Sequence, residues 1–229
     1  MPMNTLEPRL ILVDAFRFFR ASLPDLIILF IPLLLIASLG ELFFLSSSEG
    51  NKQLPVSWMI GLLFKPFYTA VLILYIQSKS SGTPLNYKSL LAKAIILWLP
   101  VFIVSFSVAI LVVFGLYAYI IPGVWIAVRL ALSEYFVIVK GLSTLEAMRE
   151  SYHWSEGNFW PLLAVLLVAI VPVIVFGKLV NALLNPAKQN VILGILSQTL
   201  VSFAGLFSII VLYRVFMLLT EEKTGSSKE

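Results

Sequence analysis

Four charged residues inside or at the edge of long apolar stretches are the strongest candidates for chemistry: Glu41, Lys65, Arg129 and Glu134. A charge at the centre of a membrane span costs about 2.5–3.5 kcal/mol on insertion scales, so each of these residues needs a partner or a purpose. Two interpretations remain open for them. The charges pair with one another and fix the packing of helices, or they form a polar track for a substrate or a proton. Glu41, which lies nearer the end of its stretch, can also reach an interface.

Depth and sign together predict how these charges pair. At 1.5 Å of rise per helical residue, Lys65 and Glu134 lie about 15 Å and about 17 Å below the outer ends of their apolar stretches. Arg129 and Glu41 are shallower, at about 9 Å and about 6 Å. We therefore expect an ion pair between Lys65 and Glu134, with Arg129 reaching toward Glu41. The four residues together form a candidate intramembrane polar cluster.

The sequence offers no other obvious chemical centre. It contains no cysteine and a single histidine, His153, so a soft metal site has no second ligand of either type. It has no Gly-x-Ser-x-Gly elbow, no P-loop and no His-Glu-x-x-His motif. We therefore expect no catalytic, cofactor-binding or metal-binding residues and no cofactor. Nucleic-acid binding is also disfavoured, because the basic residues form no concentrated stripe.

The composition indicates that lipid is the solvent of this chain. Hydrophobic residues make up 60% of it and charged residues 12%, against about 45–50% and about 25% in soluble domains. Apolar stretches long enough to cross a bilayer as helices recur along the sequence. The sequence predicts an all-α polytopic membrane protein with six transmembrane helices, at 26–45, 55–77, 94–120, 124–140, 159–180 and 191–219. A tight apolar hairpin at Ile121-Pro122-Gly123 is expected to join the third and fourth helices.

These six spans fall into three repeated units within a single membrane domain. Each unit consists of an interfacial amphipathic helix followed by a hairpin of two spans, and the units cover approximately 5–77, 83–140 and 143–220. Thr83-Pro84 and the capping-box pattern Ser143-x-x-Glu146 are typical helix starts and open the second and third units. Residues 221–229 form a charged tail.

The distribution of lysine and arginine predicts the orientation. Eleven of the sixteen fall on the side of both termini and of the amphipathic helices: Arg9, Arg17, Arg20, Lys79, Lys88, Lys93, Lys140, Arg149, Arg214, Lys223 and Lys228. The opposite loops hold Lys52, Lys178 and Lys188. Because cytoplasmic loops are enriched in basic residues, both termini and the charged tail are expected in the cytoplasm of a bacterial inner-membrane protein.

Several short motifs in the chain resemble the YciC family of bacterial inner-membrane proteins. They are Pro122-Gly123-Val124-Trp125-Ile126-Ala127, Gly141-Leu142-x-x-Leu145-x-Ala147-Met148-x-x-Ser151, Gly157-Asn158-Phe159-Trp160, Phe16-Arg17-Phe18-Phe19 and Tyr213-Arg214-Val215-Phe216-Met217-Leu218. They mark helix boundaries rather than chemical groups. The resemblance covers most of the chain and implies a six-span inner-membrane protein, without implying an activity.

Two functions of different classes follow from these observations. The leading hypothesis is a non-enzymatic membrane protein that acts in envelope or lipid homeostasis by binding membrane lipids or partner proteins, with self-association as a further option. The alternative is a small permease or lipid translocator that uses the intramembrane charges Lys65, Arg129 and Glu134. An intramembrane enzyme ranks third, because no paired acid, base or nucleophile is evident.

Overall fold

The computed structural model describes residues 8–46, 53–82, 86–184 and 190–226, and this part of the chain is all-α, as the sequence predicts. No strand occurs within these ranges. The helices in chain order are α1 (Pro8–Ser46), α2 (Gln53–Ser80), α3 (Tyr87–Ala118), α4 (Ile120–Leu130), α5 (Ser133–Lys140), α6 (Thr144–Trp154), α7 (Phe159–Leu184) and α8 (Val191–Ser226).

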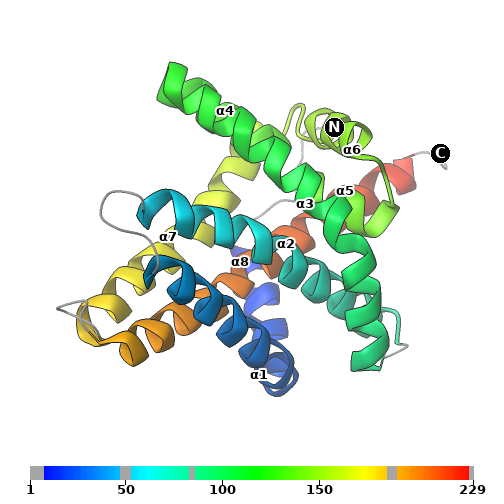
Figure 1. The fold of residues 1–229 in the computed structure, drawn as a ribbon. Coiled ribbons are helices and arrows are strands. Elements are labelled where there is room, and N and C mark those ends of the chain that lie inside the picture. Colours follow the sequence, from blue (N-terminus) through cyan, green and yellow to red (C-terminus); the bar gives the residue numbers. More distant parts are fainter. Residues whose placement is uncertain (1–7, 47–52, 83–85, 185–189, 227–229) are drawn as a thin grey trace.

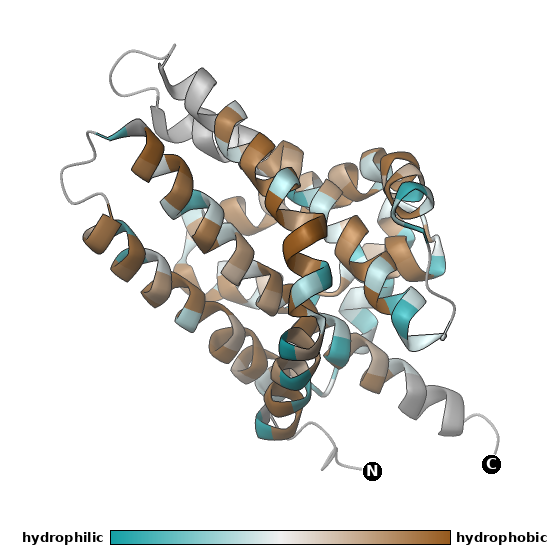
Figure 2. Cartoon of the chain, turned by 90° about the horizontal axis from the view of Figure 1, so that it is seen from below, coloured by the Kyte–Doolittle hydropathy of each residue, from teal (hydrophilic) through white to brown (hydrophobic). Residues whose placement is uncertain are grey.

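Six helical segments are long and apolar enough to cross a bilayer. They are Arg9–Gly40, Gly61–Ser80, Tyr87–Ala118, Ile120–Lys140, Phe159–Leu184 and Ile192–Thr220. Many of their large apolar side chains face outward, among them Ile28, Ile96 and Val175. Figure 2 shows hydrophobic residues along most of the length of the long helices. This is the surface of a multi-pass membrane protein, because lipid solvates apolar side chains that water would not.

The amphipathic segments join their spans in two ways. The first and second belong to the same helices as the spans that follow them, with Pro24 inside α1 and Pro100 inside α3. Proline removes a backbone donor and kinks a helix, and α1 changes direction along its length in Figure 1. The third amphipathic segment is a separate helix, α6, divided from α7 by Gly157 at a φ of 79°.

The chain reverses between the third and fourth spans earlier than the sequence predicts. The turn lies at Tyr119, which has an extended backbone, and not at 121–123. Pro122 and Gly123 belong to α4. Proline is tolerated there because the N–H groups of a first helical turn have no intrahelical partner. Gly123 lets α4 approach α3, since a Cβ on it would lie 2.6 Å from the backbone nitrogen of Leu116.

The fourth span also differs from its expected form. The sequence predicts one helix over 124–140, but α4 ends at Leu130 and α5 begins at Ser133. Ala131 and Leu132, here called the α4–α5 break, form a turn between the two. Arg129 and Glu134 lie on its two sides. The break therefore separates two of the charges on which the candidate cluster was based.

The core and the ends of the bundle are defined by contacts between distant segments. Phe136 of α5 packs edge-on against Phe216 of α8, with ring centroids 5.0 Å apart. Arg214, near the end of α8, lies 3.4 Å from Asp14, near the start of α1. Both termini lie at one end of the molecule in Figure 2. The chain therefore runs from one end of the bundle to the other an even number of times.

Candidate functional site

The α4–α5 break places charges where helix dipoles favour them. Arg129 lies in the last turn of α4, and Glu134 lies in the first turn of α5. The C-terminus of a helix carries partial negative charge and the N-terminus partial positive charge, so both residues sit at the end that stabilises them. Each half-helix thus offsets part of the cost of its own charge. This arrangement needs no direct ion pair between the two residues.

Ser151 of α6 satisfies backbone groups that the break exposes. Its hydroxyl donates to the carbonyl oxygen of Arg129 at 2.8 Å and accepts from the N–H of Leu132 at 3.2 Å. In a continuous helix that N–H would donate to Val128 instead. Ser151 and Leu132 are both buried. Buried backbone groups outside a regular helix need such partners from protein or water, and α6 supplies them here.

Local interactions hold α6 beside the α4–α5 break. Ser143 and Glu146 form the capping box that the sequence predicts at its start. The Ser143 hydroxyl and backbone N–H both donate to the Glu146 carboxylate and hold its pKa below the ordinary value. At the other end of α6, the Lys140 ammonium lies 5.0 Å from the ring centres of both Phe136 and Trp154. These contacts attach α6 to the end of α5.

Arg129 lies between two aromatic rings. Its guanidinium carbon is 5.3 Å from the Trp125 ring centre and 4.9 Å from that of Tyr152. Its Nη1 donates to the Tyr152 carbonyl oxygen at 3.5 Å, the limit of a hydrogen bond, and its Nε is buried without a partner. No ion pair joins Arg129 to a carboxylate in the described part of the chain. We call Arg129, Trp125 and Tyr152 the Arg129 site.

Two other members of the predicted cluster, Glu134 and Lys65, have environments of their own. Glu134, half-buried, accepts a hydrogen bond from the Ser105 hydroxyl of α3 at 2.8 Å. Lys65 is exposed on α2. The ion pairs between described residues do not include Lys65 with Glu134, so that pairing is wrong. The estimate of depth assumed one continuous helix over 124–140, whereas the helix is interrupted before Glu134, which accepts its hydrogen bond from Ser105 of α3.

The predicted approach of Arg129 to Glu41 stays a prediction. Arg129 contacts α6, while Glu41 falls near the opposite end of the 39-residue helix α1 from Pro8. The side chain of Glu41 lies outside the described residues. Among the described side chains, no ion pair joins Lys65, Arg129 and Glu134 to one another.

A polar cluster between α1 and α2 escaped the sequence analysis. Lys79 donates to Asp25 at 3.2 Å and to Ser22 at 3.1 Å, and the Tyr75 hydroxyl also donates to Asp25. The Lys79 ammonium lies 5.9 Å from the ring centre of Phe18. The spacing of Tyr75 and Lys79, one helical turn apart, and an acidic residue directly after Pro24 were the available signals. Their contacts join two helices rather than forming an open site.

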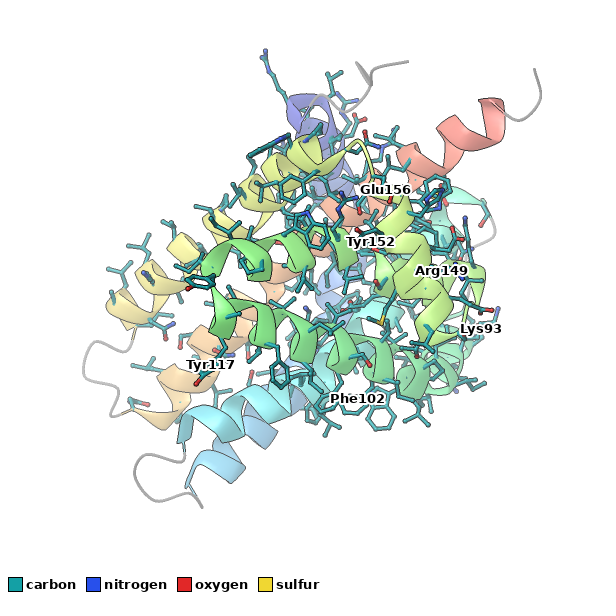
Figure 3. The ribbon with its side chains drawn as sticks, turned by 90° about the horizontal axis from the view of Figure 1, so that it is seen from above. Lys93, Phe102, Tyr117, Arg149, Tyr152 and Glu156 are labelled. Carbon is teal, nitrogen blue, oxygen red and sulfur yellow. The ribbon has the colours of Figure 1, made fainter. Side chains whose placement is uncertain are left out.

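We call the end of the molecule that holds both termini the basic end. Its surface carries apolar and basic side chains next to each other. On α1 a hollow of about 520 Å³ is lined by Val13, Phe16, Arg17, Arg20 and Ala21. Val13 and Phe16 are exposed beside the two arginines. In Figure 3, Lys93 and Arg149 lie toward one end of the ribbon and Tyr117 toward the other. The basic end thus combines apolar side chains with positive charge.

A second hollow, between α2 and α3, is apolar. It measures about 260 Å³ and is lined by Leu63, Phe64, Phe67, Ile95 and Trp98. The Trp98 indole donates to the Leu63 carbonyl oxygen at 2.9 Å, which joins the two helices at this level. No group of three His, Cys, Asp or Glu side chains within the described ranges is arranged to hold a metal ion.

Comparisons with known proteins give no relative for this chain: no protein-family model, no curated protein and no solved structure matches it.

Proposed function

We propose that this is a non-enzymatic multi-pass protein of the bacterial inner membrane that binds anionic phospholipids at its basic end and acts in envelope or lipid homeostasis. The observation that carries the proposal is the exposed face of α1, where Phe16, 59% exposed, and Val13 stand beside Arg17 and Arg20. Apolar side chains next to arginines match the boundary between acyl chains and anionic headgroups. Each basic residue near such a surface contributes about 1 kcal/mol of attraction.

The cytoplasmic orientation of the basic end is part of this proposal. Eleven of the sixteen lysines and arginines fall on the side of the termini and the amphipathic segments. The cytoplasmic leaflet carries negative surface potential, so a basic end that faces it gains attraction from every such residue. Membership of the YciC family, which the motifs suggest, belongs to the same proposal.

Lipid selectivity tests the proposal directly. The full-length protein is placed in nanodiscs of equal phosphatidylglycerol and phosphatidylcholine and then released into mild detergent, and the lipids that remain bound are counted by native mass spectrometry. We expect enrichment of phosphatidylglycerol, and we expect the double variant Arg17→Gln/Arg20→Gln to lose much of it. Lys178→Gln, on the exposed surface of α7, is the matched control. Equal retention of the two lipids by the unmodified protein would reject the function.

A small permease or lipid translocator is the second candidate, and the broken fourth span is the observation that favours it. Discontinuous helices at membrane depth are characteristic of transporter binding sites. Glu134 at the start of α5 would then be the functional charge. Reconstituted protein should accelerate flip-flop of a fluorescent phospholipid, and Glu134→Gln should slow it. Flip-flop no faster than in empty vesicles would remove this candidate.

A further inference from the structure

We infer that the Arg129 site binds the phosphate group of a single membrane lipid, an inference that rests on the proposed function and names one place where it occurs. The starting point is the charge of Arg129. A guanidinium stays ionised in proteins and carries five N–H donors. Here one of them makes a hydrogen bond at the 3.5 Å limit, and Nε is buried without a partner. The described carboxylates supply no counter-ion to it.

Two cations on other long helices, Lys79 and Arg214, show what Arg129 lacks. Lys79 lies 3.2 Å from the Asp25 carboxylate, and Arg214 lies 3.4 Å from the Asp14 carboxylate. Both belong to apolar helices, and both have an acidic partner on a neighbouring helix. Arg129 has two aromatic faces instead. Such faces attract a cation, but they do not neutralise its charge. An anion from outside the chain completes the arrangement.

The geometry of the site selects a phosphate over a smaller anion or an acidic side chain. Trp125 and Tyr152 hold the guanidinium from two sides, and their own rings meet edge to face with centroids 5.6 Å apart. With its position fixed by the rings and Nε buried, the terminal nitrogens remain as donors. Two parallel N–H groups match two oxygens of a phosphate, which a lysine ammonium cannot reproduce.

The position of the site identifies the source of the phosphate as a lipid. Trp125 and Tyr152 are 39% and 38% exposed, so the site opens to the surroundings of the protein. It lies where the last turn of α4 meets α6, the amphipathic helix that carries Arg149. Exposed tryptophan and tyrosine are typical of the level of lipid headgroups. A phospholipid can place its phosphate between these rings and leave its acyl chains along the apolar surface of α4.

The binding is also connected to the α4–α5 break. The carbonyl oxygen of Arg129 is the group that Ser151 caps, and the carbonyl oxygen of Tyr152 is the acceptor of the Arg129 guanidinium. The same two residues therefore hold the ligand and join α4 to α6. Occupation of the site should strengthen this junction.

Native mass spectrometry of the full-length protein from phosphatidylglycerol nanodiscs tests the inference. We expect one phosphatidylglycerol molecule to persist at collision energies that remove the rest. Arg129→Gln should lower the retained fraction at least tenfold, and Arg129→Lys should lower it several-fold, because the lysine keeps the charge but loses the paired donors. Lys178→Gln, on the exposed surface of α7 and outside the basic end, should retain it as the unmodified protein does.

Two variants of Tyr152 distinguish a loss of lipid binding from a loss of folding. Tyr152→Phe keeps the ring and the backbone carbonyl and should retain the lipid, whereas Tyr152→Leu removes the ring and should release it. Persistent lipid in Arg129→Gln or Tyr152→Leu would overturn the site. If phosphatidylglycerol enrichment itself survives in those variants, the proposed function stands without the site; its absence in the unmodified protein would remove both.

A competition experiment tests whether the bound phosphate belongs to a lipid or to a free ion. The same measurement is made after incubation with 50-fold excess inorganic phosphate at matched ionic strength. Retention of the lipid supports a lipid site, because the acyl chains add affinity that a free ion lacks. Complete displacement by inorganic phosphate would overturn the assignment to a lipid.

Discussion

The interrupted span α4–α5 and the continuous pair α7–α8 satisfy their buried polar groups in different ways. α7 and α8 are continuous through their spans and use neutral contacts, such as the Ser208 hydroxyl donating to the Ala169 carbonyl oxygen at 2.8 Å and Ser197 lying 3.1 Å from Asn181. The fourth span is interrupted and carries two charges, and it depends on a hydroxyl from α6. A continuous helix satisfies its own backbone, whereas an interrupted one needs a third element.

The close helix crossings should differ most in their tolerance of an added methyl group. A Cβ at Gly123 would lie 2.5 Å from the Leu116 side chain and 2.6 Å from its backbone nitrogen, so Gly123→Ala should cost about 3 kcal/mol. A Cβ at Gly177 would meet Val201 of α8 at 3.1 Å, where a side chain can yield, and Gly177→Ala should cost about 1 kcal/mol. Unfolding in mixed micelles measures both, with Gly205→Ala as a neutral control. Equal costs would show that the two crossings are alike.

Removing a hydroxyl should also cost more at the break than in the continuous pair. Ser151→Ala leaves the buried N–H of Leu132 without its partner and the Arg129 carbonyl oxygen with only the 3.4 Å hydrogen bond from the Ser155 hydroxyl, for a loss of about 2 kcal/mol. Ser208→Ala removes a bond of the same length to a carbonyl within α7, and should cost about 1 kcal/mol or less. The same unfolding measurement applies. A Ser151→Ala protein as stable as Ser208→Ala would mean that α6 does not support the break.

The partner of Glu134 can be identified by double-mutant cycles. Ser105→Ala and Glu134→Gln should couple by about 1 kcal/mol, because the two side chains share a hydrogen bond. Lys65→Met and Glu134→Gln should be additive within about 0.5 kcal/mol, because Lys65 is exposed and forms no ion pair with Glu134. A coupling confined to the Lys65 cycle would restore the pairing predicted from depth.

The smallest expected effect is a pH dependence of α6, which the α7–α8 pair should lack. The pKa of Glu146 is lowered from 4.5 by the hydrogen bonds from Ser143. A depressed folded-state pKa means that the capping box stabilises α6 fully above the pKa of the unfolded chain and is lost as pH falls through the folded-state pKa. Amide exchange of α6, corrected for intrinsic rates, should quicken in acid below that value. Exchange in Glu146→Gln that follows the same pH profile would assign the change to another group.

Much of the architecture follows from the sequence alone. An apolar content of 60% leaves lipid as the solvent, and in lipid every backbone donor and acceptor must be satisfied within the protein, which selects helices. The six spans follow from the length of the apolar stretches. The capping box at Ser143 and Glu146 is equally local, because its partners are three residues apart. The division into three units remains a prediction from the repeated pattern.

The arrangement of the candidate site could not be predicted from the sequence, because it depends on contacts between segments that lie far apart along the chain. Residue types predicted Arg129 and Glu134 within an apolar stretch, but the interruption between them is accompanied by hydrogen bonds from Ser151, 19 residues beyond Leu132. The partner of Glu134 is the Ser105 hydroxyl on α3, 29 residues away in sequence. Hydropathy and helical rise measure position along one helix. They carry no information on which neighbouring helix a side chain meets, and only the tertiary packing decides it.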